Sequence, residues 1–199
     1  RARLEALLEE GKVEASEVRK RVTMLPQAAR TLADNVFETV AAGTLKRRRI
    51  VIRYGARSTG ESTERTISPQ RLVHYRDNWY VDAWCHLRNE LRKFAVDAIA
   101  DARLTEERAK AVDLREVERE FNSGYGIFGG TKVRWAKLRF APSRARWVAQ
   151  ERWHPDQRGR AEADGSYVLE VPYTDSRGLM MDILKYGSEV EVLGPSSLV

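Results

Sequence analysis

The N-terminal part of the chain has the apolar spacing of helices. Leucines recur at helical intervals within residues 3–10, and a second apolar-periodic run extends over residues 28–42 and stops at Gly43. From Ile50 onward the apolar period changes to two, which is the period of a strand with one buried face. The pattern therefore predicts a helical lead-in over residues 1–45, followed by β structure.

Residues 46–112 contain a series of short alternating segments separated by turn signals. The intervals between them are too short for crossover helices, so the strands must pair antiparallel, as a small barrel or roll. Pro69 cannot donate to a ladder and predicts a strand end or an edge. The predicted strands are Ile50–Tyr54, Thr63–Ile67, Arg71–Tyr75, Asn78–Cys85 and Leu91–Val96.

Residues 113–131 are predicted to connect two domains. Asp113 begins a short helix that ends at Phe121, with the spacing of a capping box. The glycine-rich run over residues 123–130 lacks the Gly-Lys-Ser/Thr ending of a phosphate loop, so we interpret it as a linker.

Residues 132–199 alternate between strand and helix patterns in the order β-α-β-β-α-β. This is the split βαβ arrangement of ferredoxin-like domains, and Asp164-Gly165 provides its hairpin turn. The predicted fold class is thus α+β, with two domains behind a helical lead-in. The predicted elements of the second domain are Val133–Phe140, Ser143–Gln150, Trp153–Ala163, Tyr167–Tyr173, Ser176–Tyr186 and Val190–Leu193.

Composition excludes several protein classes. The 199 residues are 42% hydrophobic, which is too apolar for a disordered tail, and no run approaches the roughly 18 apolar residues of a membrane span. The only cysteine, Cys85, excludes an internal disulfide framework and a multi-cysteine metal site. The chain opens at Arg1 without a signal peptide, so we expect a cytoplasmic fragment whose N-terminal part is missing.

The positive charge is concentrated in one segment. The chain carries a net charge of +6, and residues 44–100 contain twelve Lys and Arg against six Asp and Glu, so the remainder is neutral. A polyanion partner would bind this segment. A solvated basic face without a partner is the alternative, and charge alone does not separate the two.

The sequence predicts neither catalysis nor a cofactor. The three histidines are His74, His86 and His154. His74 and His86 could lie on neighbouring strands, but no carboxylate or cysteine at ligand spacing completes a metal site, and the common catalytic and nucleotide-binding motifs are absent. Cys85 and His86 are neighbours on a predicted strand and point to opposite faces, which prevents a Cys–His pair.

Aromatic residues alternate with cations in the basic segment. Proteins bind single-stranded nucleic acids by stacking bases on aromatic rings and by pairing cations with phosphates, so this segment has both requirements. Core packing is the favoured interpretation for Trp79 taken alone. Arg65 shares a strand face with Ile67, and Arg92 shares one with Phe94. Arginines beside apolar side chains could form the rim of a pocket and bind phosphate oxygens there. The alternative is that both arginines form structural ion pairs, for example with Asp82 or Asp97. The candidate nucleic-acid-binding residues are Arg65, Arg71, His74, Tyr75, Arg76, Trp79, Tyr80, Arg88, Arg92 and Lys93.

These segments resemble the WYL domain of bacterial transcription regulators and the C-terminal extension that follows it. Two departures are Val81, at the third position of the naming triad, and Ala98, where the family usually has Arg. The matching motifs are Arg65-x-x-x-Pro69-x-x-Leu72, Trp79-Tyr80-Val81-x-Ala83, Arg92-x-Phe94-x-x-Asp97-x-Ile99, Leu138-x-Phe140, Trp153-His154-Pro155-x-Gln157 and Tyr186-Gly187.

The resemblance implies an Sm/SH3-like β-barrel that senses an effector, with single-stranded DNA as that effector and a role in a DNA-damage response. It also implies a homodimer, and a winged helix-turn-helix outside this chain that binds promoter duplex DNA. Two alternatives remain open, a small-molecule or nucleotide sensor and a pure dimerisation scaffold. At Ala98 the implied arginine role is lost or transferred to a neighbour.

Overall fold

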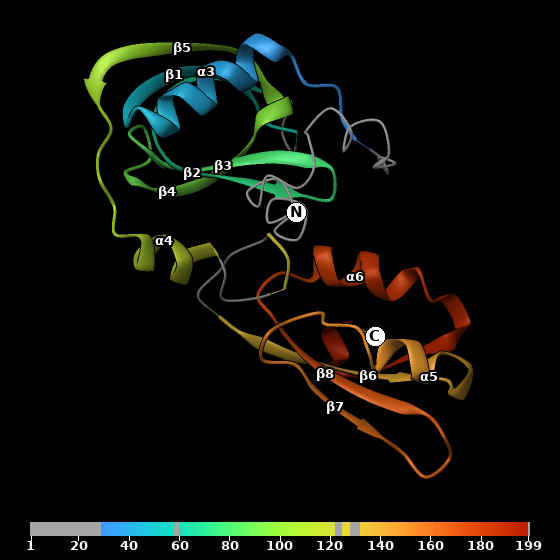
Figure 1. Ribbon diagram of the computed structural model, residues 1–199. Coiled ribbons are helices and arrows are strands. Elements are labelled where there is room, and N and C mark those ends of the chain that lie inside the picture. Colours follow the sequence, from blue (N-terminus) through green and yellow to red (C-terminus); the bar gives the residue numbers. More distant parts are fainter. Residues whose placement is uncertain (1–28, 58–59, 122–124, 128–131, 199) are drawn as a thin grey trace, which may run out of the picture.

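The computed structural model describes residues 29–57, 60–121, 125–127 and 132–198, and it has two antiparallel sheets, each with its own core (Figure 1). The helix predicted over residues 3–10 and most of the predicted glycine-rich linker lie outside the described residues. The α+β fold class is confirmed.

The first domain is one helix set against a five-stranded sheet of order β4-β3-β2-β1-β5. Helix α3 packs on β1, β2 and β5, and the sheet curves around it (Figure 1). Within the described strands no pairing joins β4 to β5, so the predicted barrel is an open roll that α3 fills. The elements are α3 (Asp34–Leu45), β1 (Arg48–Gly55), β2 (Ser62–Tyr75), β3 (Asn78–Cys85), β4 (Glu90–Ala95), η1 (Val96–Ala98) and β5 (Ile99–Arg108).

Strand alternation determines which face of this sheet is buried. Val81, Ala83 and Cys85 of β3 are fully buried on the concave face, together with Val40 of α3. The intervening positions of β3 lie on the convex face. The thiol of Cys85 is therefore part of the hydrophobic core.

The strand predictions for the first domain were wrong in two respects. Pro69 does not end a strand, because β2 runs through it, and a register shift between Pro69 and Arg71 accommodates the missing donor. Strand β5 was not predicted, since Ile99 is its only buried residue and its sequence therefore lacks the alternation that marks a strand.

The second domain has the predicted βαββαβ order, with sheet order β7-β8-β6-β9. Residues 153–157, predicted as strand, form a loop in which the Gln157 side chain accepts from the backbone N–H groups of Trp153 and His154. The elements are α4 (Leu114–Phe121), β6 (Arg134–Phe140), α5 (Pro142–Val148), β7 (Arg158–Ala161), β8 (Tyr167–Tyr173), α6 (Ser176–Leu184), η2 (Gly187–Glu189), β9 (Val190–Gly194) and η3 (Ser196–Leu198); α4 precedes this domain in the chain.

The segment over residues 109–121 covers the convex face of the first sheet. Lys110 donates its backbone N–H to Ser68 and accepts at its carbonyl from Gln70, both at 2.8 Å. Its ammonium lies 3.1 Å from the centroid of the Trp84 ring. At the end of α4, Phe121 is buried beneath the ammonium of Lys93. The outer aromatic face expected from the sequence is therefore partly occupied by the chain itself.

Candidate functional site

A pocket of about 700 Å³ surrounds the edge strand β4, on the side of the first sheet nearest the second domain. Six cations and two acids line it, so its walls are electropositive. Its lining residues are Arg30, Tyr54, Ala56, Arg57, Arg65, Tyr80, Glu90, Leu91, Arg92, Lys93, Phe94, Ala95, Glu120, Phe121, Ile127 and Arg177.

Strand register brings two of these guanidinium groups to the end of the concave face. Arg65 lies opposite Ile52 in the β1–β2 ladder, and Arg92 lies opposite Ala83 in the β3–β4 ladder. Both partners are fully buried, and cross-strand partners project to the same face of a sheet. The two arginines therefore emerge where the hydrophobic core meets the pocket, as the shared-face pattern predicted.

Arg65 differs from the other pocket cations in its partners. Its Nε donates to Thr63 Oγ1 at 3.0 Å, and its Nη1 lies 4.0 Å from Cys85 Sγ. Both contacts are to neutral groups, and within the described part of the chain Arg65 has no carboxylate partner. Its charge is thus held in place without being neutralised, which is the state in which a guanidinium binds phosphate oxygens.

The other pocket arginines pair with acids. Arg92 lies 2.7 Å from Glu90, and both side chains are about half exposed. Arg177 lies 2.7 Å from Asp175. Arg57 and Arg30 share the carboxylate of Asp97 next to Ala98. The Arg92–Glu90 pair is exposed on both sides and contributes little free energy, so a phosphate can replace the Glu90 carboxylate at small cost. The Asp97 side chain is only 5% exposed, so the pairs of Arg57 and Arg30 are of a different kind.

Asp82 neutralises two of the predicted binding residues inside the protein. It is fully buried, and its carboxylate pairs with Arg71 at 2.6 Å and with Lys93. Burial lowers the pKa of the Lys93 ammonium, and Asp82 counteracts part of that effect. The alternative that Asp82 forms ion pairs with Arg65 or Arg92 is therefore wrong, because Asp82 pairs with Arg71 and Lys93 instead.

The predicted aromatic residues divide between core and pocket. Trp79 packs on the first core, with its ring centroid 5.1 Å from Phe37 and 4.9 Å from His74. Tyr80 is half-buried on the convex face of the sheet and lines the pocket. Tyr80 is consequently the predicted ring that a base in the pocket would reach.

The ten predicted site residues do not form one surface. Arg65, Tyr80, Arg92 and Lys93 line the pocket. His74 and Arg88 are exposed away from it, Arg76 contacts the second domain, and Tyr75 accepts a hydrogen bond from Arg76.

Three pocket arginines were not predicted. Arg57 lies in the basic segment, so its charge was a usable signal, whereas Arg30 and Arg177 reach the pocket only through the tertiary fold.

Two further tests concern metals and membranes. Among the described residues no three His, Cys, Asp or Glu side chains gather closely enough to hold a metal ion. None of the helices in the described ranges combines the length and apolar composition needed to cross a bilayer.

Comparison with known families gives two successive matches. The model of the WYL domain matches residues 35–104, and the model of the WCX domain matches residues 132–199. The first match contains β1 to β4 and most of the pocket, and the second contains the βαββαβ sheet.

Curated relatives extend this likeness. Protein PafC of Mycobacterium tuberculosis (strain CDC 1551 / Oshkosh) is 31% identical over 160 residues, which are 80% of this chain and 49% of the relative. The DNA-binding transcriptional repressor CapW of Escherichia coli (strain KTE188) is 31% identical over 84 residues, 42% of this chain and 28% of the relative. The chain thus spans about half or less of the length of these relatives.

A solved structure titled as a CRISPR Cas-related protein matches with a TM-score of 0.50 and 11% identity. The match covers 82% of this chain and 47% of the solved one. At this identity the likeness concerns the fold.

Proposed function

This chain is a WYL-domain protein homologous to transcription regulators, and we propose that it is the effector-sensing and dimerising part of a bacterial DNA-binding regulator. In this proposal the promoter duplex is bound by a DNA-reading domain outside this chain, and the protein acts in the cytoplasm as a homodimer. The proposal includes no catalytic step, because sensing requires binding energy alone.

We propose single-stranded DNA as the effector. The observation that carries this is Arg65, whose guanidinium lines the pocket with neutral partners only. Arg92 adds a cation whose exposed partner Glu90 can be replaced by a phosphate, Arg57 adds a second cation to the pocket wall, and Tyr80 offers a ring for stacking. Phosphate pairing together with base stacking binds single strands without reading their sequence. Because single strands accumulate when DNA is damaged, we propose that the regulator acts in a DNA-damage response.

A small-molecule or nucleotide effector is the second candidate. The pocket volume of about 700 Å³ lies within the range of about 300–1,000 Å³ that small-molecule sites occupy. A mononucleotide would use the same arginine and ring but would make few phosphate contacts, so its binding would depend weakly on salt.

Fluorescence anisotropy with a labelled oligothymidylate separates these candidates. We expect the single strand to bind more tightly than the same sequence as duplex, and its affinity to fall steeply between about 50 and 200 mM salt. Arg65→Gln should remove most of this binding. Arg103→Gln, which removes the same charge from an exposed position on β5 outside the pocket, should not.

Two results would count against single-stranded DNA as the effector. One is equal affinity for duplex and single strand, and the other is full binding by Arg65→Gln. Tight, salt-tolerant binding of a mononucleotide that displaces the oligonucleotide would favour the second candidate.

A further inference from the structure

The turn between β2 and β3 reaches across to the second domain. Its two central residues, Arg76 and Asp77, have φ of 48° and 59°, the positive values that a type I′ hairpin turn requires. Arginine is uncommon in this region, since its Cβ disfavours positive φ. An unfavourable backbone conformation at Arg76 is retained here because contacts from elsewhere in the fold hold the side chain.

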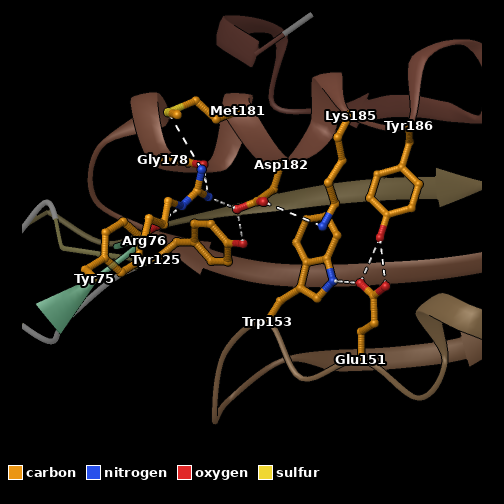
Figure 2. A network of polar contacts seen from close by, with 10 residues as sticks. All are labelled: Tyr75, Arg76, Tyr125, Glu151, Trp153, Gly178, Met181, Asp182, Lys185 and Tyr186. Atoms are coloured by element: carbon orange, nitrogen blue, oxygen red, sulfur yellow. Dashed lines mark hydrogen bonds and ion pairs between the residues drawn. The ribbon is translucent and has the colours of Figure 1, made fainter. Parts of the chain in front are cut away.

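Helix α6 provides those contacts. The Arg76 guanidinium forms an ion pair with Asp182 and lies 3.4 Å from the carbonyl oxygen of Gly178 (Figure 2). These two residues lie one turn apart on one face of α6, whereas Leu179 and Ile183 pack into the core of the second domain. The helix therefore has one face in its own core and another against the β2–β3 turn.

The chain between the domains completes the contact. Tyr125 donates its hydroxyl to Asp182, and burial beside that carboxylate raises the pKa of Tyr125, which keeps the proton in place (Figure 2). The Tyr75 hydroxyl accepts from Arg76 Nε at 2.9 Å. At Gly126, with φ of 76°, a Cβ would lie 2.9 Å from that same hydroxyl, so the close approach requires glycine.

The same helix also supplies a wall of the pocket. Asp175 caps α6 by accepting from the backbone N–H of Arg177 at 2.9 Å, which fixes Arg177 relative to the helix axis. The Arg177 side chain lines the pocket opposite residues of β4. Any movement of α6 away from the β2–β3 turn would therefore remove Arg177 from the pocket.

We propose that the Arg76–Asp182 ion pair is a clasp that positions α6, so that Arg177 reaches the effector pocket and effector binding depends on docking of the second domain. This inference rests on the proposed function of the pocket. If the clasp acts in this way, an anion that contacts both Arg65 and Arg177 binds more tightly when the two domains are docked than when they are apart.

The test measures docking and binding separately in the full chain. Spin labels on Ala100→Cys and Ala163→Cys, two exposed positions in different domains, report the distance between the domains by pulsed electron paramagnetic resonance. Cys85 is buried and stays unlabelled. The variants are Arg76→Gln, Asp182→Asn and the exchange Arg76→Asp with Asp182→Arg. The matched control is Arg103→Gln.

We expect a narrow distance distribution in the parent and in the control, and a broad one in both single variants. Oligothymidylate affinity should fall roughly tenfold in the single variants, a typical size for coupling between sites. The exchange should narrow the distribution again and restore part of the affinity.

An unchanged distance distribution in Arg76→Gln would overturn the clasp. A broadened distribution with unchanged oligonucleotide affinity would overturn its coupling to the pocket. If the parent chain binds no oligonucleotide, the proposed effector is wrong, and the distance measurement still decides whether the clasp holds the domains together.

Discussion

The buried carboxylate of Asp82 is the strongest single test of how the first domain is held together. Asp82 is inaccessible to solvent, and its partners Arg71 and Lys93 have side chains that are 25% and 13% exposed. Asp82→Ala removes the carboxylate that pairs with the largely buried Lys93 ammonium, and it also removes one ion-pair partner of Arg71. Removing one partner of a buried pair costs about 3–5 kcal/mol. Because Arg71 can turn toward water, we expect a loss of about 3 kcal/mol in the free energy of unfolding.

That loss is large enough to measure in two ways. For a domain of 60–100 residues, each kcal/mol lost from the free energy of unfolding lowers the midpoint of thermal unfolding by about 4–8 °C. The first domain of Asp82→Ala should therefore melt at least roughly 12 °C lower than that of the parent. Urea titration followed by tryptophan fluorescence gives the same quantity at constant temperature. The control is Arg92→Ala, whose pair with Glu90 is exposed and should contribute less than about 1 kcal/mol.

A compensating variant tests the physical cause. If the loss of the Asp82 carboxylate from this buried cluster is the cause, replacing the whole cluster by Asp82→Leu, Arg71→Met and Lys93→Met should recover much of the stability, because well-packed apolar side chains replace a buried ion pair at little net cost. A loss below about 1 kcal/mol in Asp82→Ala would refute the reasoning. So would a triple variant less stable than Asp82→Ala.

Two further predictions concern the direction in which a single substitution changes stability or a pKa. Gly43→Ala should lower the free energy of unfolding of the first domain by about 1–3 kcal/mol in urea titration, although alanine favours helices. The reason is that the alanine Cβ would lie 2.6 Å from the Cγ2 atom of the fully buried Ile50. A variant more stable than the parent would show that the core rearranges to accommodate the methyl group. Hydrogen bonds from Ser166 lower the pKa of Asp164 to about 2, so the stability from this carboxylate is complete above its ordinary pKa of 3.8 and is lost as the pH falls toward 2. Carboxyl-detected NMR titration of Ser166→Ala should show this pKa rising toward 3.8, and an unchanged value would mean that the backbone N–H of residue 166 and Arg139 cause the shift without the hydroxyl.

Alternation along β3 is the part of the fold that the sequence determines most directly. Val81, Ala83 and Cys85 are the apolar set of one strand face, and they are the residues that fill the concave side of the sheet. The second domain was predictable for the same reason, since its strands and helices differ clearly in period. Strand β5 was not, because it pairs with β1 through backbone groups while Ile99 is its only buried residue.

Prediction of the site was limited by partners that are distant in sequence. Arg76 and Asp182 are 106 residues apart and meet only when the two domains dock. The 109–121 segment covers Trp84 and brings Phe121 to the pocket. The hydrophobic periodicity of the sequence does not predict where this segment packs. Motif residues identify a domain, whereas the location of a pocket depends on which segments the fold places around it.

The charge surplus of residues 44–100 shows why counting charges does not locate a binding site. Arg71 and Lys93 share Asp82, Arg57 pairs with Asp97, and Arg76 pairs with Asp182. These cations contribute to the net charge of +6 and yet have specific internal partners. What distinguishes Arg65 is the neutrality of its contacts, since an anion that binds it displaces no carboxylate. The affinity of the pocket for phosphate should therefore depend more on Arg65 than on any paired arginine, although each removes one positive charge.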